Sequence, residues 1–122
     1  MKNTVKIKKE KIIDAKGKTL GRVSSEIAVS LMGKDSPSFE RHVYSGSKTK
    51  VLNASKIKIT AKKLENLAHK RYSGYRGGLK VITGDKTKEE KGMRELVRLS
   101  VYRMLPGNKL RKEMMKNLKI EE

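Results

Sequence analysis

The chain has 122 residues, which is enough for one domain with a modest hydrophobic core. It carries 31 lysine and arginine residues against 13 acidic ones, and a net charge of +18 destabilises an isolated fold unless a polyanion neutralises it. Disulfides and thiolate metal sites are excluded because there is no cysteine, and no apolar run is long enough to span a bilayer. Composition therefore predicts a soluble, intracellular protein whose first candidate partner is nucleic acid, with an anionic membrane second.

Residues 12–34 predict a strand, a short loop and an amphipathic helix, and the rest of the chain is organised around this unit. Ile12 and Ile13 are β-branched and favour a buried strand. Thr19 is the expected N-cap of the helix, and Gly33 is the expected residue just beyond its end. Four apolar residues recur between them at helical spacing and predict a stripe that faces a core: Leu20, Val23, Ile27 and Leu31.

The residues on either side of this unit predict an arm, a loop and two short strands. Residues 1–10 are basic and have too few apolar side chains to be firmly ordered. Residues 35–50 are expected to form a loop. Short strands are expected at residues 51–53 and 57–59, with one turn of helix at residues 54–56 between them.

The segment 62–80 is rich in lysine, arginine, tyrosine and glycine, and it has too few apolar residues to bury a face of its own. We therefore expect it to project from the domain. A solvated charged loop is the simplest interpretation, but Tyr72 and Tyr75 are interleaved with Arg71 and Arg76. Tyrosine can stack on an unpaired base while arginine holds a phosphate, so the segment predicts a nucleic-acid contact. Val81 and Ile82, which follow, fit either a strand or the lead-in to a helix.

The C-terminal part predicts two helices and a final strand. Helical periodicity returns at Met93 and ends at Leu105, because Pro106 cannot continue a helix. Asn108 is the expected cap of another helix, and Ile120 is expected in a last short strand. The apolar stripe of that helix comprises Leu110, Met114 and Leu118. Helices separated by short aliphatic strands predict a layered α/β fold.

No catalytic or metal-binding constellation is complete. Residues 17–19 read Gly-Lys-Thr, the end of a phosphate-binding loop, but Ile12 occupies the position where that motif requires its first glycine. The helix N-terminus near Leu20 could still receive one phosphate of a larger ligand. His42 and His69 lack companion carboxylates at metal-ligand spacing, which favours polar or RNA-contacting roles. We therefore expect no enzymatic activity, no cofactor and no metal.

Short motifs follow one another in a fixed order between residues 11 and 120. They are Asp14-Ala15, Gly17, Leu20-Gly21-Arg22, Gly33-Lys34, His42-Val43, Asn53-Ala54, Lys56-Ile57, Thr60, Ser73-Gly74-Tyr75, Gly77-Gly78 and Met104-Leu105-Pro106. Each piece is weak alone, but the ordered set is specific, and with it the chain resembles the large-subunit ribosomal protein thirteen family (the universal L-thirteen family). Two motifs depart from the family pattern. This chain has Gly46-Ser47 where the family has Gly-Asp, and it has Thr60-Ala61-Lys62-Lys63 where the family has Thr-Gly-x-Lys.

The resemblance implies a three-layer α/β/α domain over residues 11–122 around a small, mostly parallel four-stranded sheet. The basic segment, at about residues 61–80, is then a projecting loop. It also implies a non-enzymatic constituent of the large ribosomal subunit in the cytoplasm. Such a protein binds large-subunit (23S-type) ribosomal RNA, stabilises the RNA fold during early assembly and contacts neighbouring ribosomal proteins. No membrane and no small-molecule substrate is expected.

The residues expected to contact RNA combine the basic segment with cations and histidines elsewhere in the chain. They are Lys18, Arg22, Lys34, His42, Lys56, Lys62, Lys63, His69, Lys70, Arg71, Tyr72, Tyr75, Arg76, Lys80, Arg103, Lys109, Arg111 and Lys112. Two other classes of protein remain open. A non-ribosomal nucleic-acid-binding protein should bind duplex DNA and ribosomal RNA about equally, and a phosphate-loop enzyme should lose nucleotide binding on Lys18→Ala.

Overall fold

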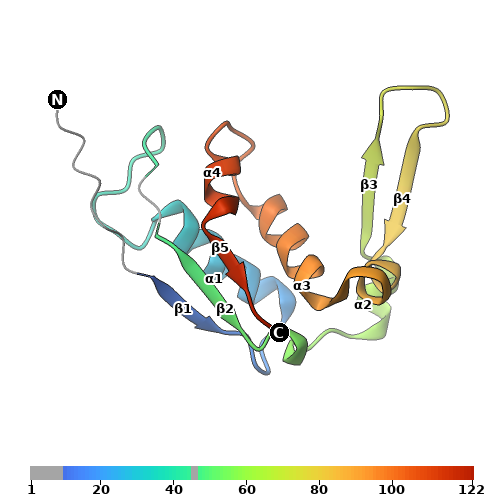
Figure 1. Ribbon diagram of the computed structural model, residues 1–122, viewed down its shortest axis with the longest axis horizontal. Coiled ribbons are helices and arrows are strands. Elements are labelled where there is room, and N and C mark those ends of the chain that lie inside the picture. Colours follow the sequence, from blue (N-terminus) through green and yellow to red (C-terminus); the bar gives the residue numbers. More distant parts are fainter. Residues whose placement is uncertain (1–9, 45–46) are drawn as a thin grey trace.

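A computed structural model describes residues 10–44 and 47–122, so nearly all of the expected basic arm lies outside the described residues. Figure 1 shows a body of helices and parallel strands from which one long hairpin projects. No helix in the described part of the chain is both long and apolar enough to cross a bilayer. The elements in chain order are β1 (Lys11–Asp14), α1 (Leu20–Met32), β2 (Thr49–Leu52), the 3-10 turn η1 (Ala54–Lys56), α2 (Ala61–Asn66), β3 (Ala68–Tyr72), β4 (Leu79–Thr83), α3 (Gly84–Met104), α4 (Arg111–Lys116) and β5 (Leu118–Ile120).

The main sheet has three parallel strands in the order β1–β2–β5, which confirms the α/β class and the mostly parallel sheet. Ile13, Val51 and Ile120 lie side by side on its buried face. Neighbouring residues of a strand point to opposite faces, so Ile12 lies on the other face, where it is 62% exposed. The expectation that both isoleucines are buried is wrong. The buried face packs on α1 in Figure 1.

The fourth strand expected at residues 57–59 is reduced to a single bridge. Thr19 and Lys58 form an isolated parallel bridge, in which the Lys58 N–H donates to the carbonyl oxygen of Lys18 at 3.0 Å. The neighbouring chain turns into α1 at Leu20, so it offers no further extended residues with which to pair. The parallel sheet therefore has three strands and not four.

The core lies between α1 and α3. The four stripe residues predicted for α1 are all buried, with at most 3% of any of them exposed, and α3 contributes Leu96, Val97 and Val101 to the same cluster. Thr19 is the N-cap in an extended conformation. Gly33 ends the helix with a φ of 77°, a left-handed conformation that favours glycine, as predicted.

Helix α3 begins at Gly84 and not at Met93, and it bends at Gly92, where φ is 79°. Before this bend only Gly84 and Thr87 are buried, so the sequence there shows no apolar period. After the bend the helix follows the predicted stripe and ends at Met104, just before Pro106. The charged first half is therefore an extension that periodicity alone does not reveal.

The last helix, α4, is shorter than expected. Leu110 and not Asn108 is its N-cap, and Leu118 belongs to β5 and not to the helix. The carbonyl oxygen of Asn117 accepts a hydrogen bond from the Thr49 N–H at 3.0 Å, which draws the chain out of the helix and into the sheet. Ile120 lies in the final strand, as predicted.

Candidate nucleic-acid interface

The basic segment is an antiparallel hairpin and not a loop. Strands β3 and β4 pair over five residues each, with Tyr72 opposite Leu79 at the outer end. Gly74 and Gly77 in the connecting turn have φ values of 89° and 70°, which allow the chain to reverse. Val81 and Ile82, left open between strand and helix, belong to β4.

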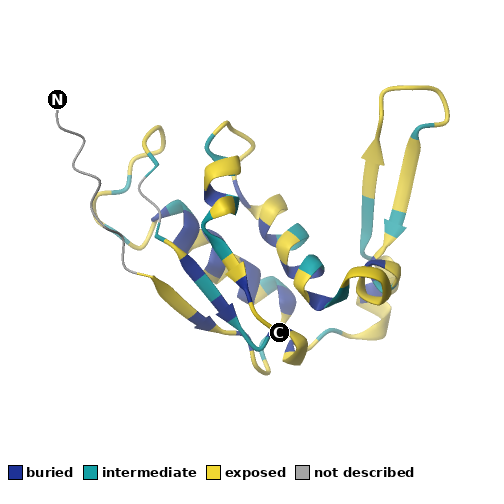
Figure 2. Cartoon of the chain, viewed as in Figure 1, coloured by how far each residue is buried: buried dark blue, intermediate teal, exposed yellow. Residues whose placement is uncertain are grey.

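The hairpin projects from the body and buries almost nothing of its own. Figure 2 shows exposed residues along most of both strands and around the tip, in contrast to the buried residues of α1 and α3. Tyr75 at the tip is 80% exposed. An isolated two-stranded hairpin is only marginally stable in water, so this element depends on its attachment to the body. The predicted projection is confirmed.

Strand pairing gives the hairpin two chemically different faces. Residues directly opposite each other, and residues two apart along a strand, share a face. The more cationic face carries His69, Arg71, Lys80 and Ile82. The second face carries Lys70, Tyr72, Leu79 and Val81, and it combines one cation with exposed aromatic and aliphatic side chains. The first face suits phosphates, and the second adds a ring that can stack on a base.

The root of the hairpin is tied to the body by two sets of hydrogen bonds. The Gly84 N–H donates to the carbonyl oxygen of Leu67 at 2.7 Å and closes the base of the hairpin. The guanidinium of Arg103 donates through both Nη atoms to the carbonyl oxygen of Ala68, at 3.4 Å each. Arg103, an expected RNA contact, therefore also fixes the hairpin against α3.

His69 lies at this root with both ring nitrogens buried, and neither has a hydrogen-bond partner among the described residues. Burial is the main cause that lowers the pKa of His69, and the positive charge of Arg103 adds to it while Glu95 opposes it. The imidazole is therefore neutral at physiological pH. The packing at the hairpin root therefore depends on the His69 side chain remaining unprotonated.

We expect the stability of the protein to fall as the pH drops below the usual histidine pKa of 6.5 toward the lowered pKa of His69. Above that window both the folded and the unfolded chain hold a neutral imidazole, whereas within it the unfolded chain binds a proton that the folded chain rejects. His69→Gln should remove this part of the pH dependence. Urea unfolding of both proteins at about pH 7.5 and about pH 5.5 measures the difference, and an equal loss of stability in the two would contradict the prediction.

The other expected RNA-contacting residues lie outside the hairpin, in three groups. Lys62 and Lys63 are exposed on α2, before the hairpin. A second group lies near the start of α1 and comprises Lys18, Arg22 and Lys56. A third lies around the cleft where the loop after α1 meets the loop before α4, and comprises Lys34, His42 and Lys109, with Arg111 and Lys112 at the start of α4.

Several of these cations already have partners. The ammonium of Lys34 lies 6.0 Å from the centre of the Phe39 ring, and the guanidinium of Arg111 lies 3.9 Å from that of the Tyr102 ring. The Nζ atom of Lys18 forms an ion pair with Glu26 at 2.9 Å. A ring contact orients a cation without neutralising its charge, whereas the carboxylate of Glu26 offsets the charge of Lys18.

The loop before α1 is not built as a phosphate cradle. The Gly17 N–H donates to the carbonyl oxygen of Lys56 at 3.1 Å, so this amide is already bonded, and the charge of Lys18 is paired with Glu26. In the described ranges, no group of three or more histidine, cysteine, aspartate or glutamate side chains could hold a metal ion. The geometry offers no support for the phosphate-loop enzyme.

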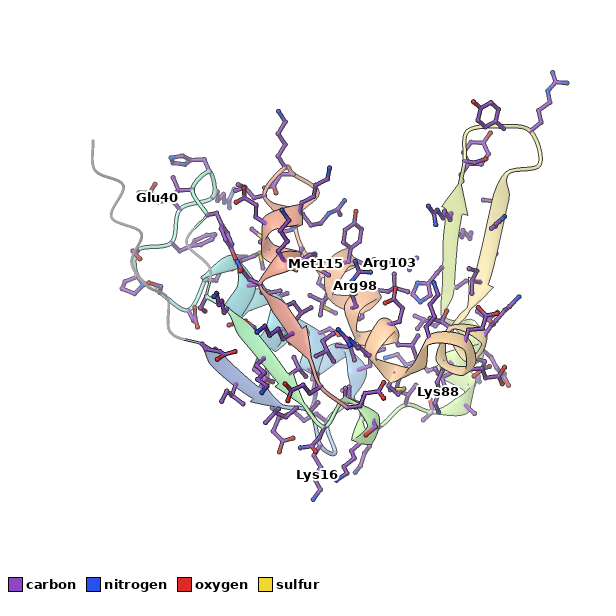
Figure 3. The ribbon with its side chains drawn as sticks, in the orientation of Figure 1. Lys16, Glu40, Lys88, Arg98, Arg103 and Met115 are labelled. Atoms are coloured by element: carbon purple, nitrogen blue, oxygen red, sulfur yellow. The ribbon has the colours of Figure 1, made fainter. Side chains whose placement is uncertain are left out.

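Sequence reasoning missed two cations on α3, Lys91 and Arg98, which line a cleft beside the hairpin. Figure 3 shows Arg98 and Arg103 on the half of α3 after the bend, and Lys88 on the half before it. In the sequence these residues look like the solvated face of a helix. Only the placement of the hairpin beside that helix shows that they face other cations.

The fold and this surface together define a basic α/β protein with a short parallel sheet and a projecting cationic hairpin. A family model described as Ribosomal protein L13 matches residues 8–121. Large ribosomal subunit protein uL13 of Thermosipho africanus is 40% identical over 126 residues, which cover 98% of this chain and 84% of that protein. The proteins of the same name from Caldanaerobacter subterraneus subsp. tengcongensis and Thermotoga petrophila are 45% and 43% identical over 109 residues, or 89% of this chain and 76% and 72% of theirs.

The chain therefore belongs to the ribosomal protein L13 family, which confirms the resemblance carried by its motifs. Proteins of this family are structural and have no enzymatic activity, so the expectation of a non-enzymatic protein is confirmed as well.

Proposed function

We propose that this chain is a cytoplasmic constituent of the large ribosomal subunit that binds large-subunit ribosomal RNA and stabilises the RNA fold during early assembly. The observation that carries the proposal is the β3–β4 hairpin, which places arginines and tyrosines on an extension with almost no buried surface. Relatives that carry the name of a large-subunit protein support the same assignment. Neighbouring ribosomal proteins are the expected further partners.

The proposed mechanism is electrostatic and geometric. Arg71 and Arg76 neutralise phosphates and release counterions, while Tyr75 is exposed enough to stack on an unpaired base. The body carries further cations at a distance from the hairpin, Lys34 and Lys109 among them. RNA segments that bind to the hairpin and to the body are held in one relative orientation, and this restricts the RNA to fewer folds.

Sedimentation of a cell lysate through a high-salt gradient tests this proposal. An isolated complex dominated by phosphate contacts loses about 10³–10⁵ in affinity between about 50 and 200 mM salt. A protein enclosed by folded RNA should nevertheless remain with the large-subunit peak, whereas an added basic protein that is not ribosomal should leave it. Loss of this chain from the ribosomal fractions at moderate salt would instead favour a general nucleic-acid-binding protein.

A further inference from the structure

A cleft of about 510 Å³ lies between the hairpin and α3, and residues of both elements line it. The hairpin wall includes His69 and Arg71, and the opposite wall includes Lys91, Arg98 and Arg103. Five lining side chains are cationic and two are carboxylates, so the cleft is positively charged while His69 is neutral. Its volume falls within the usual range of small-ligand sites, about 300–1,000 Å³. The cleft is therefore both large enough and charged enough to hold part of a polyanion.

Arg98 is the residue of the helical wall best prepared to bind a phosphate. Its Nη1 atom donates to a carboxylate oxygen of Glu95 at 3.3 Å, which orients the guanidinium. The Arg98 side chain is 56% exposed whereas that of Glu95 is 24% exposed, so the arginine extends farther toward solvent than its partner. Arginine has donors on Nε and Nη2 as well, and these bond to nothing else within the described residues. An incoming phosphate would meet an oriented cation with free donors.

Arg103 gives the same cleft a fixed geometry. Its two bonds to the carbonyl oxygen of Ala68 connect α3 to the first residue of β3, at the closed end of the cleft. The two cationic walls are therefore held apart at a set distance and not left to a freely moving hairpin. Preorganised walls of like charge are costly for the free protein, and an anion between them relieves the repulsion.

We propose that this cleft receives the phosphodiester backbone of one strand of large-subunit ribosomal RNA, which is thereby gripped between the hairpin and α3. The proposal rests on the ribosomal function proposed above and adds α3 to the RNA-binding surface. It differs from a surface contact of the hairpin alone, because the phosphates must lie between Arg71 on one wall and Arg98 on the other.

Arg98→Gln and Arg94→Gln provide a matched test, because both remove one positive charge from α3 and only Arg98 lines the cleft. Binding to protein-free large-subunit RNA from the host cell is measured over a series of salt concentrations. Arg98→Gln should weaken binding about tenfold and reduce the slope of log affinity against log salt concentration by about 0.7, whereas Arg94→Gln should change the affinity less than about twofold. Equal losses of RNA affinity in the two variants would overturn the cleft proposal. No loss of affinity in either variant would also overturn it, and would favour an acidic protein segment as the occupant of the cleft.

A crosslinking experiment keeps the test decisive if Arg98→Gln lowers the melting temperature. The chain has no cysteine, so Lys91→Cys at the cleft and Lys88→Cys outside it can each carry a short photoreactive arylazide. Crosslinks to the RNA from position 91 but not from position 88 support the proposal, and any other pattern contradicts it. If the parent protein itself shows no preference for ribosomal RNA over duplex DNA, the proposed ribosomal function is contradicted. That result is distinct from one in which the parent prefers ribosomal RNA and only the cleft proposal is contradicted.

Discussion

Replacing Arg71 and Arg76 together by alanine should weaken binding to large-subunit ribosomal RNA about a hundredfold, or about tenfold for each lost phosphate contact. Both side chains are exposed on the hairpin, and neither forms a hydrogen bond or ion pair with another described residue. The melting temperature should therefore remain unchanged, since no packing is removed. The salt slope of binding should fall by about 1.4, because each contact with single-stranded RNA contributes about 0.7.

A double variant of equal charge, Lys88→Ala with Arg94→Ala, is the control for this measurement. Both of these cations are exposed on α3 and lie outside the hairpin and its cleft. Filter binding over a salt series separates a lost contact from a general loss of positive charge. If the hairpin variant and the control bind RNA equally well and both melt like the parent, the hairpin does not carry the RNA contact.

Gly84→Ala should destabilise the protein by about 1–3 kcal/mol, a typical cost of forcing extra volume into a packed site. A Cβ atom at this position would lie 2.8 Å from the carbonyl oxygen of Leu64 and 3.1 Å from the Cβ of Leu67. The first of these is a backbone atom, so relief requires a shift between α2 and the start of α3. That shift would lengthen the hydrogen bond from Gly84 to Leu67 that closes the hairpin.

The same substitution at Gly21 should act in the opposite direction. Gly21 lies in α1, and a Cβ atom there would meet nothing within 4 Å. Alanine is a better helix former than glycine by up to about 1 kcal/mol, so Gly21→Ala should raise the unfolding free energy. Urea denaturation of both variants measures the two changes, and a shift of the same sign in both would contradict the packing argument.

The body of the fold could be read from the sequence where a single face of an element is buried. The stripe of α1 from Leu20 to Leu31 lies in the core as predicted, and Gly33 ends that helix in the predicted conformation. Ile12 shows where the argument fails. Two adjacent β-branched residues are compatible with burial on both faces, and only the arrangement of the layers decides that one face remains open.

The hairpin and the first half of α3 could not be recognised in this way, because neither has a buried face. Strand β3 reads Ala-His-Lys-Arg-Tyr, without the alternation of apolar and polar residues that marks a strand packed on a core. Residues 84–91 are mostly charged, and contacts with α2 and β4 hold their part of the helix in place. These contacts leave no periodic pattern of apolar residues in the sequence. Tertiary contacts determine the structure of both segments.

Only the hairpin side of the candidate RNA-binding surface could be predicted from the sequence. Composition alone drew attention to Arg71, Tyr75 and Arg76, because cations, rings and glycines occur there together. It could not indicate Arg98, which is one charged residue of a helix until the hairpin is placed beside it. The second wall of the cleft is a property of the fold and not of any segment.

The closed base of the hairpin separates residues that are constrained by packing in the core from residues that are not. Leu67 and Gly84 meet through one short hydrogen bond, so the sixteen residues between them, 68–83, leave and rejoin the body at one point. Most of the side chains beyond that point are exposed and place little demand on the core. With the RNA contact proposed above, substitutions on these exposed strands can follow changes in the RNA at little cost to folding, and the buried packing of the body can change without altering them.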